Sequence, residues 1–100
     1  MRYADFRKRL VGAVLNAPGD THEALRRAVL EHGSIPAALV SYVDTVKRHA
    51  YKVTDAEIAA LHSAGYSDDA LFEITVAAAV GAALHRLDRG MTALRGEEPD

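Results

Sequence analysis

Four side chains in the second half of the chain are of types that could carry out acid–base chemistry. They are His49, Tyr51, Lys52 and His85. An imidazole titrates near neutral pH, so His49 could act as a general base, and a phenol or an ammonium group beside it could donate a proton. His85 could reach into the same pocket from another helix. The sequence therefore predicts these four residues as the candidate catalytic group.

Each of the two histidines also has a structural explanation. His49 follows Lys47 and Arg48 at the end of a predicted helix, where a run of cations stabilises the negative end of the helix dipole. His85 lies in line with small residues on a long helix, where an imidazole can form a hydrogen bond at a helix or subunit interface. We favour the structural explanation for both. The other three histidines are interpreted as surface or half-buried residues: His22, His32 and His62.

Other kinds of site lack their motifs. The chain has no cysteine, which excludes disulfides, thiolate metal sites and thiol-based mechanisms. No recognisable metal motif is present, although His49, His62 and His85 could converge in space. A glycine-rich phosphate loop, a Gly-x-Ser-x-Gly motif and paired catalytic carboxylates are also missing. We expect neither a metal nor a cofactor.

The charge pattern argues against nucleic acid and membrane partners. The net charge is -2, with acidic and basic residues interspersed. The basic cluster from Arg7 to Arg9 is short and is interpreted as a solvated helix face. The apolar run 77–83 is too short, and too closely flanked by charged residues, to cross a bilayer. No signal peptide pattern follows Met1, so a cytoplasmic protein is expected.

Apolar residues recur at helical spacing along the chain, and no alternating segment is long enough to be a strand. We predict an all-α fold in one domain, residues 1–96, followed by an acidic disordered tail, residues 97–100. The five predicted helices cover approximately residues 3–15, 20–33, 34–51, 54–65 and 67–94.

Capping signals mark the ends of these helices. Asp20 with Glu23, and Thr54 with Glu57, have the spacing of capping boxes. Ser67 is a good N-cap for the long helix. Residues that end helices are predicted at Pro18, Gly33 and Gly65.

The long helix is the element on which the others are expected to pack. Between Ile74 and Leu84 it is apolar nearly all round, and one of its apolar stripes consists of Phe72, Val76, Ala79 and Ala83. Such a helix lies at the centre of a core or is shared with a partner subunit. The small residues 77–83 add little buried area, so the core of a single chain would be thin. We therefore predict a homo-oligomer formed through helix 68–94.

The segment 49–61 (HAYKVTDAEIAAL), followed by 64–69 (AGYSDD) and 72–74 (FEI), resembles the carboxymuconolactone decarboxylase / AhpD-like alkylhydroperoxidase superfamily. The resemblance covers about residues 36–94. It implies an orthogonal helical bundle in which a helix with a redox site, a short helix and a turn lead into a long alanine-rich helix.

The redox site of that family does not match. Its peroxidases carry Cys-x-x-Cys where this chain has His49-Ala50-Tyr51-Lys52, so Tyr51 fits the aromatic position while His49 and Lys52 replace the cysteines. The following histidine of the family falls near Ala56, and its upstream glutamate near Ala37. Because a thiolate must attack the peroxide, we do not expect thiol peroxidase activity.

Three functions remain open at this point, and whether the chain is an enzyme is undecided. The first is a cysteine-less family member that forms an oligomer and binds a small molecule or a partner protein without catalysis. The second is a cofactor-free decarboxylase or isomerase of a small acid, with His49 as base and Tyr51, Lys52 or His85 orienting the substrate. The third is a peroxidase-related protein that acts beside a cysteine-bearing partner.

Overall fold

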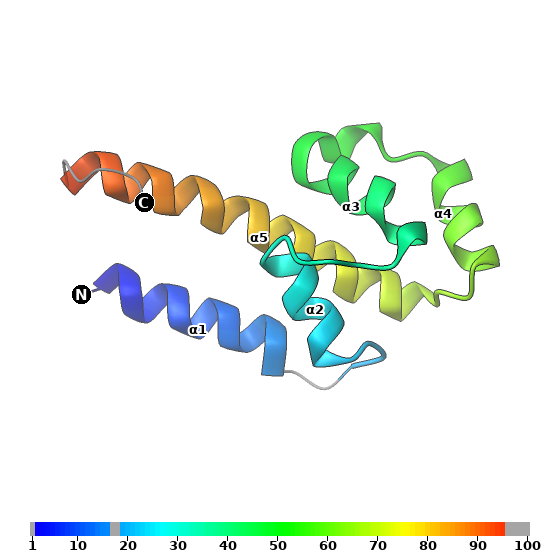
Figure 1. The fold of residues 1–100 in the computed structure, drawn as a ribbon, viewed down its shortest axis with the longest axis horizontal. Coiled ribbons are helices and arrows are strands. Elements are labelled where there is room, and N and C mark those ends of the chain that lie inside the picture. The colour runs from blue at the N-terminus through cyan, green and yellow to red at the C-terminus, as the bar shows by residue number, and fades with distance from the viewer. Residues whose placement is uncertain (1, 17–18, 96–100) are drawn as a thin grey trace.

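The structure, a computed structural model, describes residues 2–16 and 19–95, and within these ranges the chain is helical with no strand. The elements in chain order are α1 (Arg2–Asn16), α2 (Glu23–Leu30), α3 (Ala37–His49), the short 3-10 helix η1 (Ala50–Lys52), α4 (Asp55–Ser63) and α5 (Asp68–Arg95). The predicted all-α class and the long C-terminal helix are confirmed (Figure 1). The predicted stop at Pro18 and the predicted tail lie outside the described residues.

The predicted ends of α4 are largely confirmed. The Thr54 side chain accepts a hydrogen bond of 3.2 Å from the backbone amide of Glu57. One carboxylate oxygen of Glu57 is buried without a hydrogen-bond partner, so that atom does not complete the capping box. At the other end Gly65 has φ = 103°, and the amide of Tyr66 donates to the carbonyl of Leu61 at 3.1 Å. Gly65 ends the helix because glycine adopts this left-handed conformation without strain.

The predicted start of α2 is wrong. The N-cap position is His22 instead of Asp20, and its side chain makes no capping hydrogen bond. The backbone amides of Asp20 and Thr21 instead donate to the carboxylate of Glu73 on α5, at 2.7 and 2.9 Å. A contact with a distant helix therefore replaces the local capping box.

The predicted end of α2 is also wrong, because the C-cap is Glu31 and not Gly33. His32, and not Gly33, adopts the left-handed conformation, with φ = 61°. The Gly33 amide then donates to the carbonyl of Ala28 at 2.7 Å, which is the hydrogen bond of a Schellman motif. The consequence is that an imidazole projects from a helix end where glycine is usual.

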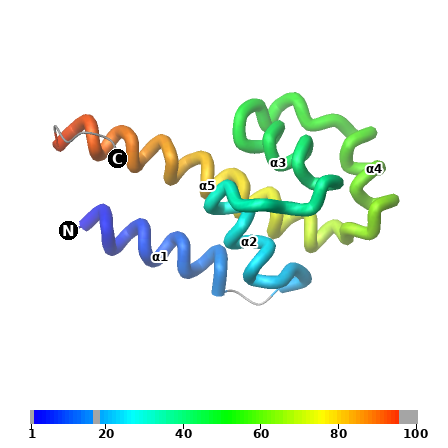
Figure 2. The backbone as a smooth tube through the Cα atoms, in the orientation of Figure 1, coloured from blue at the N-terminus to red at the C-terminus, as the bar shows by residue number. Residues whose placement is uncertain are grey.

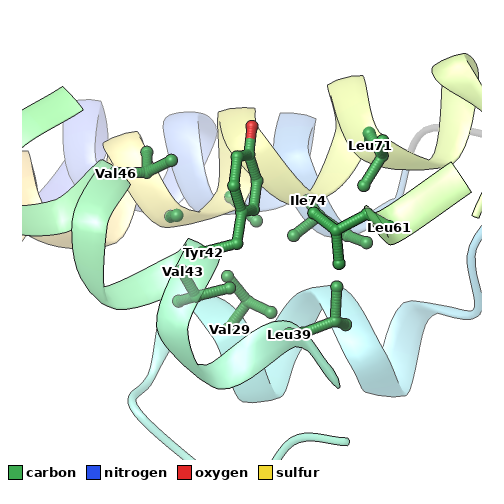
Figure 3. Packing of buried hydrophobic residues seen from close by; sticks show 10 residues of the cluster. Val29, Leu39, Tyr42, Val43, Val46, Leu61, Leu71 and Ile74 are labelled. Carbon is green, nitrogen blue, oxygen red and sulfur yellow. The ribbon is translucent and has the colours of Figure 1, made fainter. Parts of the chain in front are cut away.

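The main core lies between α2, α3, α4 and the first half of α5 (Figure 3). Val29, Leu39 and Ile74 are fully buried there, and the Tyr42 hydroxyl bonds with Thr75. A smaller cluster joins the ends of α1 and α2 to the middle of α5, and its buried members are Leu15, Leu30 and Leu84. Helix α5 therefore contributes buried residues to both clusters, as expected of the element on which the others pack.

The second half of α5 extends beyond the main core, alongside α1 (Figure 2). The two helices are joined by Asp88, which accepts hydrogen bonds from Tyr3 and from Arg7, at 2.6 Å from the hydroxyl and 2.9–3.0 Å from the guanidinium. The molecule is consequently elongated, 47 × 28 × 21 Å, and the start of α1 and the end of α5 lie at the same end of it.

By length and composition alone, α5 could cross a membrane, a test that the core helices of soluble proteins also pass. Its inner face is packed against other helices, since Ile74, Ala77 and Ala78 are fully buried. The apolar residues on this face of α5 are thus explained by their burial in the core.

Candidate functional site

Three of the four predicted site residues lie together on the surface. His49 ends α3, and Tyr51 and Lys52 belong to η1. The rings of His49 and Tyr51 meet edge to face with centroids 5.8 Å apart, and Nζ of Lys52 is 6.0 Å from the Tyr51 ring centroid. All three side chains are exposed, and Tyr51 is 79% exposed.

His85 lies beside a different histidine. Its ring contacts that of His32 edge to face, with centroids 6.3 Å apart. The two cavities that His85 lines are lined by none of His49, Tyr51 and Lys52. His85 therefore contacts His32, which is exposed, in agreement with its predicted surface or half-buried position.

Lys47 completes a group that we call the His32 cluster: His32, Lys47 and His85. Nζ of Lys47 is 2.9 Å from Nδ1 of His32 and donates a hydrogen bond of 2.7 Å to the carbonyl of Val29. Because an ammonium group is only a donor, Nδ1 of His32 is the acceptor and that ring is neutral in this arrangement. The left-handed conformation of His32 directs its ring toward Lys47 on α3 and His85 on α5.

The environment disfavours the charged forms of two members of this cluster, His32 and Lys47. Burial lowers the pKa of His32 below its ordinary value of 6.5, and the nearby Lys47 and His85 lower it further. Burial also lowers the pKa of Lys47, although the carboxylate of Asp44 acts in the opposite direction. An anion placed among these groups would favour their charged forms.

Three cavities meet at His32. One of about 280 Å³ lies between α1, α2 and α5 and includes His85 in its wall. A second of about 220 Å³ lies between α3 and α5 and includes Lys47, His85 and Arg86. A third of about 350 Å³ lies between α2 and α3. These hollows give small molecules access to the His32 cluster from several sides.

The charges around the cluster leave a local excess of cations. Asp44 pairs with Arg48 at 2.9 Å, and Glu31 pairs with Arg27 at 3.4 Å. Arg86 donates to the backbone carbonyl of Lys47 at 3.3 Å. Within residues 2–16 and 19–95, neither Lys47 nor Arg86 forms an ion pair with a carboxylate. The arrangement can therefore bind an anion through one ammonium group and two imidazoles.

A second polar cluster is buried, but it has the geometry of a structural support. Arg26 is 6% exposed and donates to the carbonyls of Val14 and Leu15 at 3.0 and 2.8 Å. Its guanidinium also lies 3.7 Å from the carboxylate of Glu73. Hydrogen bonds from Thr21 lower the pKa of Glu73, so this carboxylate is held in its charged form. The cluster fixes the α1–α2 connection onto α5.

Metal binding finds no support in the described part of the chain. No group of three His, Asp or Glu side chains among residues 2–16 and 19–95 could hold a metal ion.

The fold and the His32 cluster define a small all-helical protein with a cationic hollow at the junction of α2, α3 and α5. Comparisons of the chain with protein-family models, with curated proteins and with solved structures found no match.

Proposed function

We propose that this protein is a binding domain for a small anion, such as a short carboxylic acid or phosphate, and that it has no thiol peroxidase activity. The observation that carries the proposal is the convergence of cavities on His32, with Nζ of Lys47 at 2.9 Å and the ring of His85 at 6.3 Å. Cavities of about 220 and 280 Å³ suit a small acid better than a drug-sized ligand, for which about 300–1,000 Å³ is usual.

Binding fits the geometry better than catalysis at the predicted residues. A decarboxylase or isomerase with His49 as base needs a cavity that holds the substrate against His49 and Tyr51 and excludes water. His49 and Tyr51 are exposed and line neither of the two hollows at His85, whereas His32 and His85, although also exposed, both line these two hollows.

We further infer that the protein is a cysteine-less relative of the AhpD-like superfamily. Supporting this inference are the order of elements after α3, the left-handed Gly65 and the capping of α5 by Ser67, whose side chain accepts a 3.0 Å hydrogen bond from the Ala70 amide. The complete absence of cysteine supports the lack of thiol chemistry.

The anion site is tested by titrating the protein with inorganic phosphate and with succinate while following the histidine ring signals by NMR. Sodium chloride of matched ionic strength serves as the reference. We expect saturable shifts at His32 and His85, and His85→Gln should weaken binding about tenfold, because one charge-assisted hydrogen bond is lost.

The matched control is His22→Gln, since His22 is an exposed histidine whose side chain caps nothing. This variant should bind as the parent does. Shifts that are equal in both variants, or that chloride reproduces, would overturn the proposal.

A further inference from the structure

The outer face of α5 carries a continuous apolar stripe along nearly its whole length. The stripe extends the predicted set of Phe72, Val76, Ala79 and Ala83 toward the C-terminus. We call it the outer stripe, and its members are Phe72, Val76, Ala79, Ala83, Leu87, Gly90 and Leu94. All are exposed or half-buried, and Phe72 and Leu94 are 70% and 79% exposed. An apolar surface of this length needs an explanation.

Packing in the core does not explain the outer stripe, because the stripe lies on the side of α5 opposite to the buried face. Gly81 is buried against α2, where an added Cβ would lie 2.6 Å from the carbonyl oxygen of Leu30. Phe72 and Gly90 are each nine residues from Gly81, which places them about 180° around the helix from it. Around Gly90 an added Cβ would meet nothing within 4 Å.

The spacing of the outer stripe suits a straight partner helix. Phe72, Ala83 and Leu94 are separated by eleven residues each, a repeat of about 3.67 residues per turn. The stripe therefore follows the helix axis closely over about 33 Å.

We propose that the outer stripe binds a second copy of this chain, with the two α5 helices antiparallel and related by a two-fold axis at Ala83. In this arrangement Ala83 faces Ala83, Ala79 faces Leu87 and Val76 faces Gly90. At each end Phe72 faces Leu94. Each pair other than Phe72–Leu94 contains at least one alanine or glycine. The two helices can therefore approach closely.

A parallel pair lacks this complementarity. It would set Leu87 against Leu87 and Gly90 against Gly90. The two leucines would keep the helices apart, and the two glycines would leave space between them. It would also align the helix dipoles unfavourably and bring the acidic starts of both helices, Asp68 and Asp69, together. The antiparallel pair places the two acidic starts at opposite ends of the contact.

A lipid surface fits the outer stripe less well than a second copy. Helices that lie on membranes bury bulky apolar side chains and carry lysine or arginine along their polar face. The centre of the outer stripe consists of small residues, which gain little from lipid but allow two backbones to approach.

The size of the outer stripe limits the strength of the dimer. A strip about 33 Å long and about 10 Å wide covers on the order of 350 Å² per copy. Stable interfaces bury about 800 Å² per partner, so a weak and reversible dimer is expected. The dimer does not require the anion site, and the His85→Gln variant should dimerise normally.

Disulfide trapping tests both the contact and its direction, because the natural chain has no cysteine. Under mild oxidation Ala83→Cys should form a covalent dimer, since the two-fold axis brings the Cβ atoms within disulfide range. A mixture of Phe72→Cys and Leu94→Cys chains should form the mixed dimer in excess over either homodimer. Ala24→Cys, at an exposed alanine on α2, is the control and should remain monomeric.

Each outcome of the trapping experiment has a definite meaning. Homodimers of both Phe72→Cys and Leu94→Cys with no mixed product would show a parallel pair and overturn the proposal. Equal trapping of Ala83→Cys and Ala24→Cys would show random collision and overturn it as well.

Sedimentation of the unmodified protein between about 10 and 500 µM provides the second measurement. We expect a concentration-dependent dimer that Ala83→Glu weakens at least about tenfold, since two like charges then face each other. Ala24→Glu should leave the dimer unchanged. A protein that stays monomeric over this range, or that associates only with phosphatidylcholine vesicles in a flotation assay, would overturn the proposal.

Discussion

Arg26 is the one charged side chain that is buried among residues 2–16 and 19–95. It satisfies carbonyl groups at the end of α1, which has no glycine cap within its described residues, and it lies beside the Glu73 carboxylate. An arginine with no partner would be costly to bury, so both the carbonyls and the carboxylate are needed to keep it inside. Arg26 therefore links three helices through one side chain.

We expect Arg26→Met to reduce the free energy of unfolding by about 3 kcal/mol, because it leaves the Glu73 carboxylate, the buried Leu15 carbonyl and the part-buried Val14 carbonyl without this donor. Urea denaturation followed by circular dichroism measures the change. Arg27→Met is the control, since Arg27 forms exposed pairs with Glu23 and Glu31, and it should reduce the free energy of unfolding far less than Arg26→Met. Equal losses in the two variants would contradict this role for Arg26.

At the scale of single residues, the sequence named His85 as a candidate but did not predict which side chain it contacts. His85 was predicted as a candidate, but its partner is His32, which was interpreted as a surface or half-buried residue. No local pattern predicted this contact, because it depends on a histidine in a left-handed conformation at the end of α2.

Helix α5 has two glycines, Gly81 and Gly90, that lie on opposite faces in different surroundings. Gly81 permits the close approach of α2, whereas Gly90 has open space around it. The two glycines lie on one helix and are both in helical conformation, so they form a natural matched pair.

We expect Gly81→Ala to reduce the free energy of unfolding by about 2 kcal/mol, because the new methyl group would contact the Leu30 carbonyl and force α2 away. Gly90→Ala should instead increase it by up to about 1 kcal/mol, since alanine favours helix and meets no neighbour. Thermal denaturation of both variants at low protein concentration tests this. A stabilising Gly81→Ala would show that α2 does not pack as closely as described.

The element boundaries were predictable where their signals are local. Thr54, Gly65 and Ser67 lie beside the helices they limit, and each acts in the predicted place. The predicted N-cap at Asp20 is wrong because the backbone amide of Asp20 donates a hydrogen bond to Glu73, fifty-three residues away. Hydrogen bonds between distant segments leave no periodic trace in the sequence.

For the whole molecule, we expect stability to fall in two stages on acidification. The folded-state pKa of His32 is lowered, so the unfolded chain binds more protons and stability decreases as the pH falls below about 6.5. The pKa values of Glu73 and Asp88 are also lowered, mainly by hydrogen bonds from Thr21 and Arg7. Their contribution is present above about pH 4.5 and is lost as the pH falls through their folded-state values.

The midpoint of urea denaturation between pH 8 and pH 3 checks this expectation. His32→Asn should remove the first stage, because asparagine tolerates the left-handed conformation but does not titrate. Glu73→Gln should reduce the second stage and leave the first. A single transition that is unchanged in His32→Asn would contradict the assignment.

The architecture as a whole followed from apolar periodicity, while the site did not. The helical class, the long last helix and its central position were all readable from spacing, because packing on α5 requires an apolar face at every turn. The cavities at His32 arise from how α2, α3 and α5 cross, and crossing geometry is set by side-chain shapes that a pattern of spacings does not contain.

The Asp88 contact with Tyr3 has a consequence for how the chain folds. It joins residues eighty-five positions apart, almost the full length of the protein. Closing so long a loop has a large cost in chain entropy. This cost is smaller once the intervening helices have formed and brought the two ends of the chain closer together. The first helix along the chain is therefore expected to be among the last to dock, completing the structure on a scaffold already built from α2 to α5.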